Sequence, residues 1–254
     1  MRPKPFWLRP KWLFGHVLCL TLVVLFVNLG FWQLRRLDEK QQRNALIEAR
    51  QDARPVPLDE ALAGGADDAR YRRVVLTGRW DRDATVLVRS RSLGERPGYH
   101  VVTPLVDGDG AVLVNRGFVP LLAGGEPKIL DEVRPVEEGT VDVEGIVLAT
   151  ERRGGIGPRD RAGEVLAVVN RIDVARLQQQ IDHELAPVYV QLTSPPPTGT
   201  ELPIVLPEPA TDEGPHFGYA MQWFIFATVG AIGWPLLLRK TAREQAGETS
   251  DQPA

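Results

Sequence analysis

Two long apolar stretches, one near each end of the chain, constrain the possible fold more than any other feature. They occupy residues 12–34 and 217–238. An α-helix needs roughly 20 apolar residues to cross a hydrocarbon core about 30 Å thick, so each stretch can span a membrane once. The roughly 180 residues between them suffice for one compact domain with its own core. The sequence therefore predicts a membrane protein in which two transmembrane helices flank a folded domain.

The first apolar stretch has an alternative interpretation, a signal peptide that is removed after export. Its apolar run is longer than the core of a typical signal peptide, and no small-x-small cleavage site follows it. The chain continues instead with Phe31-Trp32-Gln33-Leu34-Arg35-Arg36. We therefore interpret this stretch as a retained membrane anchor.

Basic residues flank the two stretches unevenly. Cytoplasmic segments of membrane proteins carry an excess of Lys and Arg, so these residues indicate orientation. Such residues precede the first stretch and follow the second: Arg2, Lys4, Arg9, Lys11, Arg239, Lys240 and Arg243. Arg35, Arg36, Lys40 and Arg43 oppose this assignment, but long domains translocate largely regardless of charge. The pattern predicts that both termini are cytoplasmic and that the central domain is extracytoplasmic.

These features divide the chain into five predicted parts. They are a cytoplasmic basic tail at 1–11, transmembrane helices at 12–34 and 216–238, an extracytoplasmic domain at 35–215 with a Pro-rich linker at 193–215, and a cytoplasmic tail at 239–254. About 11 residues precede the first helix, whereas a mitochondrial transit peptide needs a longer acid-poor leader. We therefore expect a multi-pass protein of a bacterial plasma membrane.

Sulfur-containing residues are scarce. Cys19 lies within the first apolar stretch and is the one cysteine, and the two methionines are Met1 and Met221. A single cysteine excludes an internal disulfide, a Cys-x-x-Cys redox centre and heme attachment through Cys-x-x-Cys-His. It also excludes the thiolate sites typical of copper chaperones.

The central domain has the sequence pattern of a β-rich fold. Short apolar or alternating segments predict strands at 73–79, 85–90, 99–106, 111–118, 140–148, 165–169 and 187–192. Asp107-Gly108-Asp109-Gly110 separates two of them as a hairpin turn. Residues 140–148 alternate between apolar and acidic side chains, which indicates a sheet with one buried face. We expect an α+β membrane protein whose outer domain is an antiparallel sheet or open barrel with one or two helices.

Two helices are expected outside the membrane. The first transmembrane helix should continue as an amphipathic stalk over 33–50, and residues 173–184 have the pattern of a helix capped by Asp173. His183 would end this second helix, and His100 lies in a predicted strand. Both histidines are interpreted as structural or exposed.

Three connecting segments are expected to lack regular structure. Residues 119–138 and 150–163 have the composition of loops, and residues 193–211, rich in proline, that of an extended linker. The basic loop at 150–163 lacks the Gly-Lys-Ser/Thr sequence of a phosphate-binding loop. It is interpreted as a solvated connector, with a surface for anionic lipid or a partner as the alternative.

Polar and aromatic residues gather at the predicted outer ends of both transmembrane helices. Because the helices run in opposite directions, Trp32 and Gln33 should lie at the same depth as His216 and Tyr219. His216, Tyr219 and Trp223 are spaced i, i+3 and i+7, so they share one helix face. Ala220, Ala227 and Gly230 add small residues at near-heptad spacing, which allow close helix packing.

Heme binding is one interpretation of this arrangement. An imidazole at the membrane boundary can ligate heme iron, and Arg35 or Arg36 can pair with heme propionates. The alternative is that Trp, Tyr and His only anchor the helix at the water–lipid interface. His16, near the cytoplasmic end of the first helix, is either a second ligand or a further interfacial residue.

The sequence does not support an enzyme. It contains no Gly-x-Ser-x-Gly or His-Glu-x-x-His motif, and no nucleophile–base pairing is evident. Its acidic residues form no paired site that sequence can identify.

Four sequence blocks resemble the surfeit locus protein one (Surf-one) family of cytochrome c oxidase assembly factors. They are Leu29-Gly30-Phe31-Trp32-Gln33-Leu34-Arg35-Arg36, Gly98-Tyr99-His100-Val101-Val102-Thr103-Pro104-Leu105, Val112-Leu113-Val114-Asn115-Arg116-Gly117-Phe118-Val119-Pro120 and His216-Phe217-Gly218-Tyr219-Ala220-Met221-Gln222-Trp223. The similarity spans about residues 12–240, and the order and position of the blocks make it specific. Phe118 stands where the family commonly has Trp, which keeps an aromatic side chain.

The resemblance implies a non-catalytic factor that acts while the heme a–containing oxidase subunit matures. Some bacterial members of this family are thought to bind heme a, and the histidine that opens the second span is a proposed ligand. That position is His216 here. The expected partners are cytochrome c oxidase subunits, other assembly factors and the lipid bilayer, with no nucleic acid. A scaffold that stabilises an oxidase intermediate without heme is the alternative.

Overall fold

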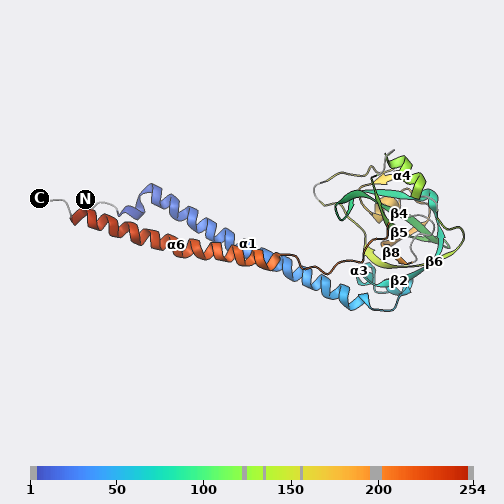
Figure 1. Cartoon of the computed structure of the whole chain (residues 1–254), viewed down its shortest axis with the longest axis horizontal. Helices are drawn as coiled ribbons and strands as arrows, with labels where there is room; N and C mark the ends of the chain where they lie inside the picture. Colours follow the sequence, from blue (N-terminus) through green and yellow to red (C-terminus); the bar gives the residue numbers. More distant parts are fainter. Residues whose placement is uncertain (1–4, 122–124, 134–135, 155–156, 195–201, 251–254) are drawn as a thin grey trace. The chain divides into compact units, whose positions relative to one another are not determined.

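A computed structural model of the chain describes residues 5–121, 125–133, 136–154, 157–194 and 202–250. The chain divides into two compact units. The first consists of Met1–Ala45 with Thr211–Ala254, and the second of Leu46–Ala210. The first unit is a pair of long helices, and the second is a β domain (Figure 1).

The helix pair contains α1 (Pro10–Gln51), which follows the short 3-10 helix η1 (Phe6–Leu8), and α6 (His216–Ser250). Both helices are long and apolar enough to cross a membrane, and only 6% of the residues in the most apolar window of each are buried. A core helix of a soluble protein would be mostly buried, so this low burial fits helices surrounded by lipid. The predicted stalk over 33–50 is confirmed, because α1 continues to Gln51.

α1 and α6 run antiparallel and contact each other along a seam with heptad spacing (Figure 1). Seam residues recur at intervals of three and four: Trp12, His16, Cys19, Val23, Phe26, Gly30 and Gln33 on α1, and His216, Ala220, Trp223, Ala227, Gly230 and Trp234 on α6. This spacing is typical of left-handed coiled coils, in which ridges of one helix fill grooves of the other.

Small residues allow the two helices to approach. Ala220 and Ala227 are buried, as predicted from their spacing. A Cβ atom on Gly30 would lie 2.6 Å from the ring of Phe224, which is closer than real Cβ contacts. The aromatic side chains of one helix therefore need glycine on the other.

We expect a cysteine at position 230 to form a disulfide with Cys19. The Cys19 Sγ lies 3.6 Å from the carbonyl oxygen of Gly230, and a Cβ at Gly230 would lie 3.1 Å from Val23 on α1. After mild oxidation of Gly230→Cys and proteolysis of the β domain, both helices should migrate as one band on a non-reducing gel. Gly233→Cys is the matched control, because nothing lies within 4 Å of a Cβ there. Equal cross-linking of both variants would contradict the seam.

The β domain is built on one sheet of eight strands. They are β1 (Val56–Pro57), β2 (Arg73–Trp80), β3 (Val86–Leu93), β4 (Arg96–Asp107), β5 (Gly110–Pro120), β6 (Val141–Ala149), β7 (Val168–Val169) and β8 (Glu184–Ser194). They lie in the order β1-β2-β6-β8-β5-β4-β3-β7, and β2 also pairs with β4. β2, β6, β8, β5 and β4 therefore form a closed barrel, and the predicted fold class, a β-rich domain between two apolar helices, is confirmed.

Glycine allows the barrel to close. β2 and β4 pair only through Arg79–Val106 and Trp80–Leu105. A Cβ on Gly78 would lie 2.5 Å from the carbonyl oxygen of Val106, so only glycine fits where the two strands meet. The remaining barrel pairs are antiparallel except β5–β8, which is parallel.

Alternating side chains from all five barrel strands fill its interior. The barrel-strand residues of this core are Val74, Leu76, Leu105, Val112, Val114, Val141, Val143, Val147, Val188, Val190 and Leu192. The predicted alternation of 140–148 is confirmed, because Val141, Val143 and Val147 of β6 face this core and Asp142 is exposed. Residues of the opposite face of β5 and β8, such as Leu113 and Tyr189, pack in a second cluster with β3, β7 and α5 (Val174–Leu177).

Short helices and tight turns connect the strands. Besides α5, the helices are α2 (Leu58–Leu62), α3 (Ala66–Ala69), η2 (Arg82–Ala84) and α4 (Gly125–Val133). The predicted hairpin turn is confirmed, because Asp107 pairs with Gly110 between β4 and β5. Gly108 has a φ of 58°, which favours glycine.

The predicted helix at 173–184 is wrong in extent. Asp173 does cap it, because its side chain accepts a hydrogen bond from Arg176 N, but α5 ends at Leu177. The following glutamines use their amides to hold neighbouring backbone groups instead. Gln178 bonds to Ile181, His183 and Leu185, and Gln180 bonds to both backbone groups of Leu166. These side-chain bonds to backbone groups override helix propensity.

The same contacts shorten the predicted strand at 165–169. The side chain of Gln180 hydrogen-bonds to both the N–H and the carbonyl group of Leu166, so these groups are not free to pair with a strand. Val165 is 85% exposed. Only Val168 and Val169 pair with β3. His183, which was predicted to end the helix, lies in a bend before β8.

Two predicted irregular segments are more ordered than expected. The prediction of a loop at 119–138 is wrong, because it contains α4, whose Ile129, Leu130 and Val133 pack on the β domain. In the predicted linker, residues 195–201 lie outside the described residues. Ile204 pairs with Phe118 of β5, so this part of the linker is bound to the barrel.

Candidate functional site

His216, the first residue of α6, contacts a residue of α1 that was predicted to lie at the same depth. Its Nδ1 lies 2.9 Å from Oε1 of Gln33. The two residues are 183 positions apart in sequence, and the depth argument from antiparallel helices brought them together correctly. The pair closes the seam at the end of the apolar part of both helices.

This hydrogen bond determines which imidazole nitrogen is available. A carboxamide oxygen only accepts hydrogen bonds, so Nδ1 carries a proton, and in the neutral imidazole Nε2 has the lone pair. No described residue donates to Nε2 of His216. Histidines that ligate metals are commonly held in this way, with one nitrogen bonded to the protein and the other directed to the metal.

The other predicted site residues are not joined to His216 by any described contact. Tyr219 and Trp32 are 48% and 46% exposed, and Arg35 is also exposed. Trp223 lies deeper in the seam, where it stacks on Phe26 with ring centroids 5.5 Å apart. These residues remain candidates because of their position at the helix ends, not because of a direct contact.

Arg35 is the better placed of the two arginines predicted for propionates. The Arg36 guanidinium already pairs with Glu39 at 2.7 Å. Among the described residues, Arg35 has no such partner, so its guanidinium is available to an external carboxylate.

His16 is not a second ligand to the same iron. Its Nδ1 accepts a hydrogen bond of 2.8 Å from Trp234 Nε1. His16 and Gln33 are separated by about 25 Å along α1, at 1.5 Å rise per residue, which is too far for two axial ligands of one heme. His16 is therefore a packing residue at the other end of the seam, and that alternative for His16 is wrong.

A second polar cluster, which the sequence did not predict, joins two of the family-like blocks in the barrel wall. Asn115 Oδ1 accepts from the backbone N–H of Gly117 at 3.2 Å. This fixes the amide, whose Nδ2 therefore donates to Nδ1 of His100 at 3.2 Å. Burial and the charge of Arg91 lower the pKa of His100 to about 4. His100 is thus a partly buried, neutral structural residue, in agreement with its predicted role.

Arg116 from the same block is buried among three elements. Its Nη1 donates to the carbonyl oxygen of Val133 in α4 at 2.6 Å, and its guanidinium carbon lies 5.7 Å from the ring centroid of Trp80 in β2. Burial lowers the pKa of Arg116 to about 10, which leaves it charged at neutral pH. These contacts indicate that Arg116 links β5 to α4 and to β2.

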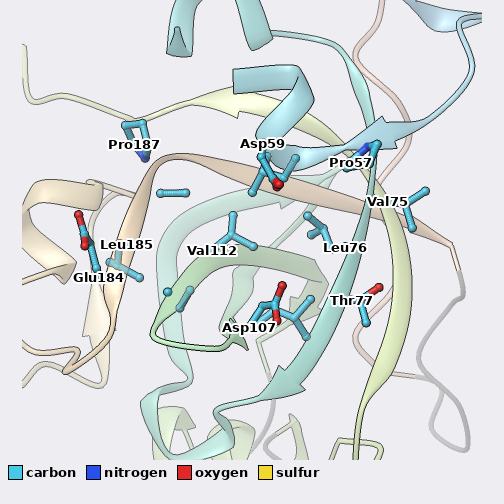
Figure 2. Close-up of a pocket in the computed structure, with 15 residues that line it drawn as sticks. Pro57, Asp59, Val75, Leu76, Thr77, Asp107, Val112, Glu184, Leu185 and Pro187 are labelled. Atoms are coloured by element: carbon cyan, nitrogen blue, oxygen red, sulfur yellow. The ribbon is translucent and has the colours of Figure 1, made fainter. Parts of the chain in front are cut away.

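A cavity of about 560 Å³ lies beside β2, the β4–β5 hairpin and the start of β8. Figure 2 shows Val112 and Leu76 within it and the carboxylates of Asp59, Asp107 and Glu184 around it. None of the described residues that line it is Lys or Arg. The cavity therefore combines an apolar floor with an acidic margin.

Along the chain, the segment that forms the closed barrel lies between two apolar helices. The helices pair with each other along a seam that ends at a histidine. These features define a class of membrane-anchored β-barrel proteins. A sequence model of the SURF1 family matches residues 20–228. An uncharacterized SURF1-like protein of Mycobacterium bovis is 31% identical over 95% of this chain and 90% of its own length. The chain therefore belongs to the SURF1 family.

Two eukaryotic relatives have more specific names. Surfeit locus protein 1 of Rattus norvegicus is 28% identical over 87% of this chain and 73% of its own length. The cytochrome oxidase assembly protein SHY1 of Saccharomyces cerevisiae is 27% identical over 64% of this chain and 44% of its own length.

Proposed function

We propose that this protein is a non-catalytic assembly factor for cytochrome c oxidase that aids delivery of heme a to the catalytic subunit. Family membership and the name of the yeast relative support the assembly role. The observation that carries the heme proposal is His216, whose Nδ1 is held by Gln33 while Nε2 is left to a ligand. Its partners would be oxidase subunits and other assembly factors.

Heme a would be cargo rather than a resident cofactor. His216 supplies one nitrogen ligand to iron, and Arg35 supplies a guanidinium for a propionate. The exposed rings of Trp32 and Tyr219 offer apolar surface to the macrocycle. A site with one protein ligand on an open surface binds weakly enough to release its cargo to the oxidase.

We also propose that the protein resides in a bacterial plasma membrane with both termini cytoplasmic. The Lys and Arg residues that precede the first helix and follow the second support this orientation. The β domain would then lie outside the cytoplasm. A phosphatase reporter that stays inactive when fused within the β domain would contradict this topology.

His216→Ala is expected to remove most of the heme that co-purifies with the protein. The wild-type protein and the variant would be purified from cells that make heme a, and heme per protein measured from the absorption spectrum. Gln33→Leu should retain Nε2 but loosen the imidazole, so an intermediate heme content is expected. His183→Ala is the control, because His183 lies outside the helix pair. Equal heme in wild type and His216→Ala would exclude this ligand.

A heme-independent scaffold is the second candidate function. The acid-margined cavity of the β domain favours it, because such a surface suits a basic, partly apolar segment of an oxidase subunit (Figure 2). The same variant distinguishes the two functions. If His216→Ala lacks heme but still restores oxidase activity in a deletion strain, the scaffold is the better description.

A further inference from the structure

Four arginines of the β domain converge on one small pocket. Its described lining consists of Arg153, Arg159, Asp160, Arg171, Asp173 and Arg176, and its volume is about 230 Å³. Two arginines come from the basic loop at 150–163, one follows β7, and Arg176 lies in α5. We propose that this pocket binds a phosphate group, either as inorganic phosphate or as the headgroup of an anionic phospholipid. The proposal is independent of the proposed heme site.

The pocket is held in place by its own carboxylates. Both oxygens of Asp160 accept from the backbone N–H of Asn170, at 3.0 and 3.1 Å, and Oδ1 also accepts from Asn170 Nδ2 at 2.5 Å. Asp173 Oδ1 accepts from the backbone N–H of Arg176 at 3.2 Å. Both carboxylates therefore bond to neutral amides, although they offset part of the positive charge.

The charge of the lining is unbalanced. Four guanidinium groups face two carboxylates, which leaves two excess positive charges. Arg159 and Arg171 form no ion pair with any described residue, and Arg171 donates only to the carbonyl oxygen of Pro158, at 3.0 Å. Like charges gathered in one pocket repel each other unless an anion lies between them.

Arg176 gives an independent reason to expect an anion. It is 8% exposed, and its Nη atoms donate to neutral acceptors, the carbonyl oxygens of Arg161 and Glu164 and the Gln180 side chain. Its Nε is buried and has no partner among the described residues. A buried guanidinium with no described carboxylate partner is unfavourable, and an anion in the pocket that it lines would offset its charge.

The chemistry and size of the pocket favour phosphate. Guanidinium groups donate pairs of parallel hydrogen bonds that match the oxygens of a phosphate. Ligand pockets for whole drug-sized molecules measure roughly 300–1,000 Å³, so this smaller pocket suits a single phosphate group with water. The donors are side chains, which explains why the loop needs no Gly-Lys-Ser/Thr sequence.

The test measures phosphate binding by the full chain in phosphatidylcholine nanodiscs. Inorganic phosphate and water-soluble dihexanoyl-phosphatidylglycerol would each be titrated by calorimetry, with dihexanoyl-phosphatidylcholine as the acyl-chain control. We expect saturable binding to the wild type, and at least a 10-fold weaker affinity for the double variant Arg159→Gln/Arg171→Gln. Tighter binding of the lipid analogue would identify a headgroup as the ligand, and binding of phosphate alone a free anion.

A control double variant, Arg152→Gln/Arg161→Gln, removes the same amount of charge, from the loop at 150–163, without changing the side chains that line the pocket. It should bind like the wild type. Far-UV circular dichroism and the thermal midpoint of each variant would establish that the β domain is folded. Equal weakening in both double variants, or no saturable binding by the wild type, would overturn the proposal.

Discussion

Gly98→Ala is expected to destabilise the β domain by about 3 kcal/mol or more, which is the upper range for overpacking in a protein interior. A Cβ on Gly98 would lie 2.1 Å from the carbonyl oxygen of Val119 and 2.7 Å from the ring of Phe118. Phe118 and Val119 are fully buried. The backbone of β5 would have to move, because a carbonyl oxygen cannot rotate away as a flexible side chain can.

Urea unfolding of the detergent-solubilised protein, followed by pulse proteolysis of the β domain, would measure this loss. Gly110→Ala, at the other end of the same hairpin, is the matched control. The nearest atoms to its Cβ would lie at 3.8 Å, so the midpoint should stay within about 0.5 kcal/mol or rise slightly through reduced chain entropy. Similar midpoints for both variants would mean that the β4–β5 contact at Gly98 is looser than described.

Local sequence pattern predicted those elements whose signal is contained in a short segment. The two apolar helices, the Asp107–Gly110 turn and the alternation of β6 each depend on neighbouring residues only. The parallel β5–β8 pair and the closure of β2 on β4 depend on residues far apart in sequence. No local pattern encodes such pairings. The strands of an open barrel and of a closed barrel therefore have the same kind of sequence pattern.

The missed helix at 119–138 and the overlong helix at 173–184 have different causes. The apolar residues of α4, Ile129, Leu130 and Val133, have helical spacing, but the glycines and prolines of 119–138 obscured this signal. At 173–184, the polar run has high helix propensity, but the Gln178 side chain bonds to the backbone of His183 and the Gln180 side chain to that of Leu166 instead. A sequence pattern shows what a segment favours alone and not what its neighbours require.

The candidate sites divide in the same way. His216 and Gln33 were predicted to meet because the depth of each residue follows from its place in a membrane helix. The arginine pocket was not predicted, since Arg159, Arg171 and Arg176 come from a loop, a strand end and a short helix. Only the basic character of 150–163 hinted at it. Residues in the two membrane helices can be compared by their depth in the bilayer, which predicts which of them lie close together. Residues of the barrel and its loops have no such common coordinate.

His100 makes the β domain sensitive to acid. Its pKa is lowered to about 4 in the folded protein, whereas an unfolded chain has a histidine pKa of about 6.5. Above pH 6.5 the residue is neutral in both states and has no effect. Between pH 6.5 and 4 the unfolded chain binds a proton that the folded protein does not. Stability is therefore lost as the pH falls, by up to about 3 kcal/mol.

His100→Asn should abolish this contribution, because an asparagine oxygen can accept the Asn115 hydrogen bond but cannot be protonated in this range. Urea midpoints at pH 7.5, 6.5, 5.5 and 4.5 would be compared between the wild type and the variant, so that titration of carboxylates cancels. At pH 7.5 the variant should be less stable than the wild type, because the smaller asparagine side chain leaves unfilled volume. Its stability should fall less than that of the wild type as the pH is lowered. His183→Asn removes a histidine from a bend and should follow the wild type. Parallel curves for the wild type and His100→Asn would show that His100 accepts a proton in the folded barrel, which its hydrogen bond from Asn115 and the charge of Arg91 oppose.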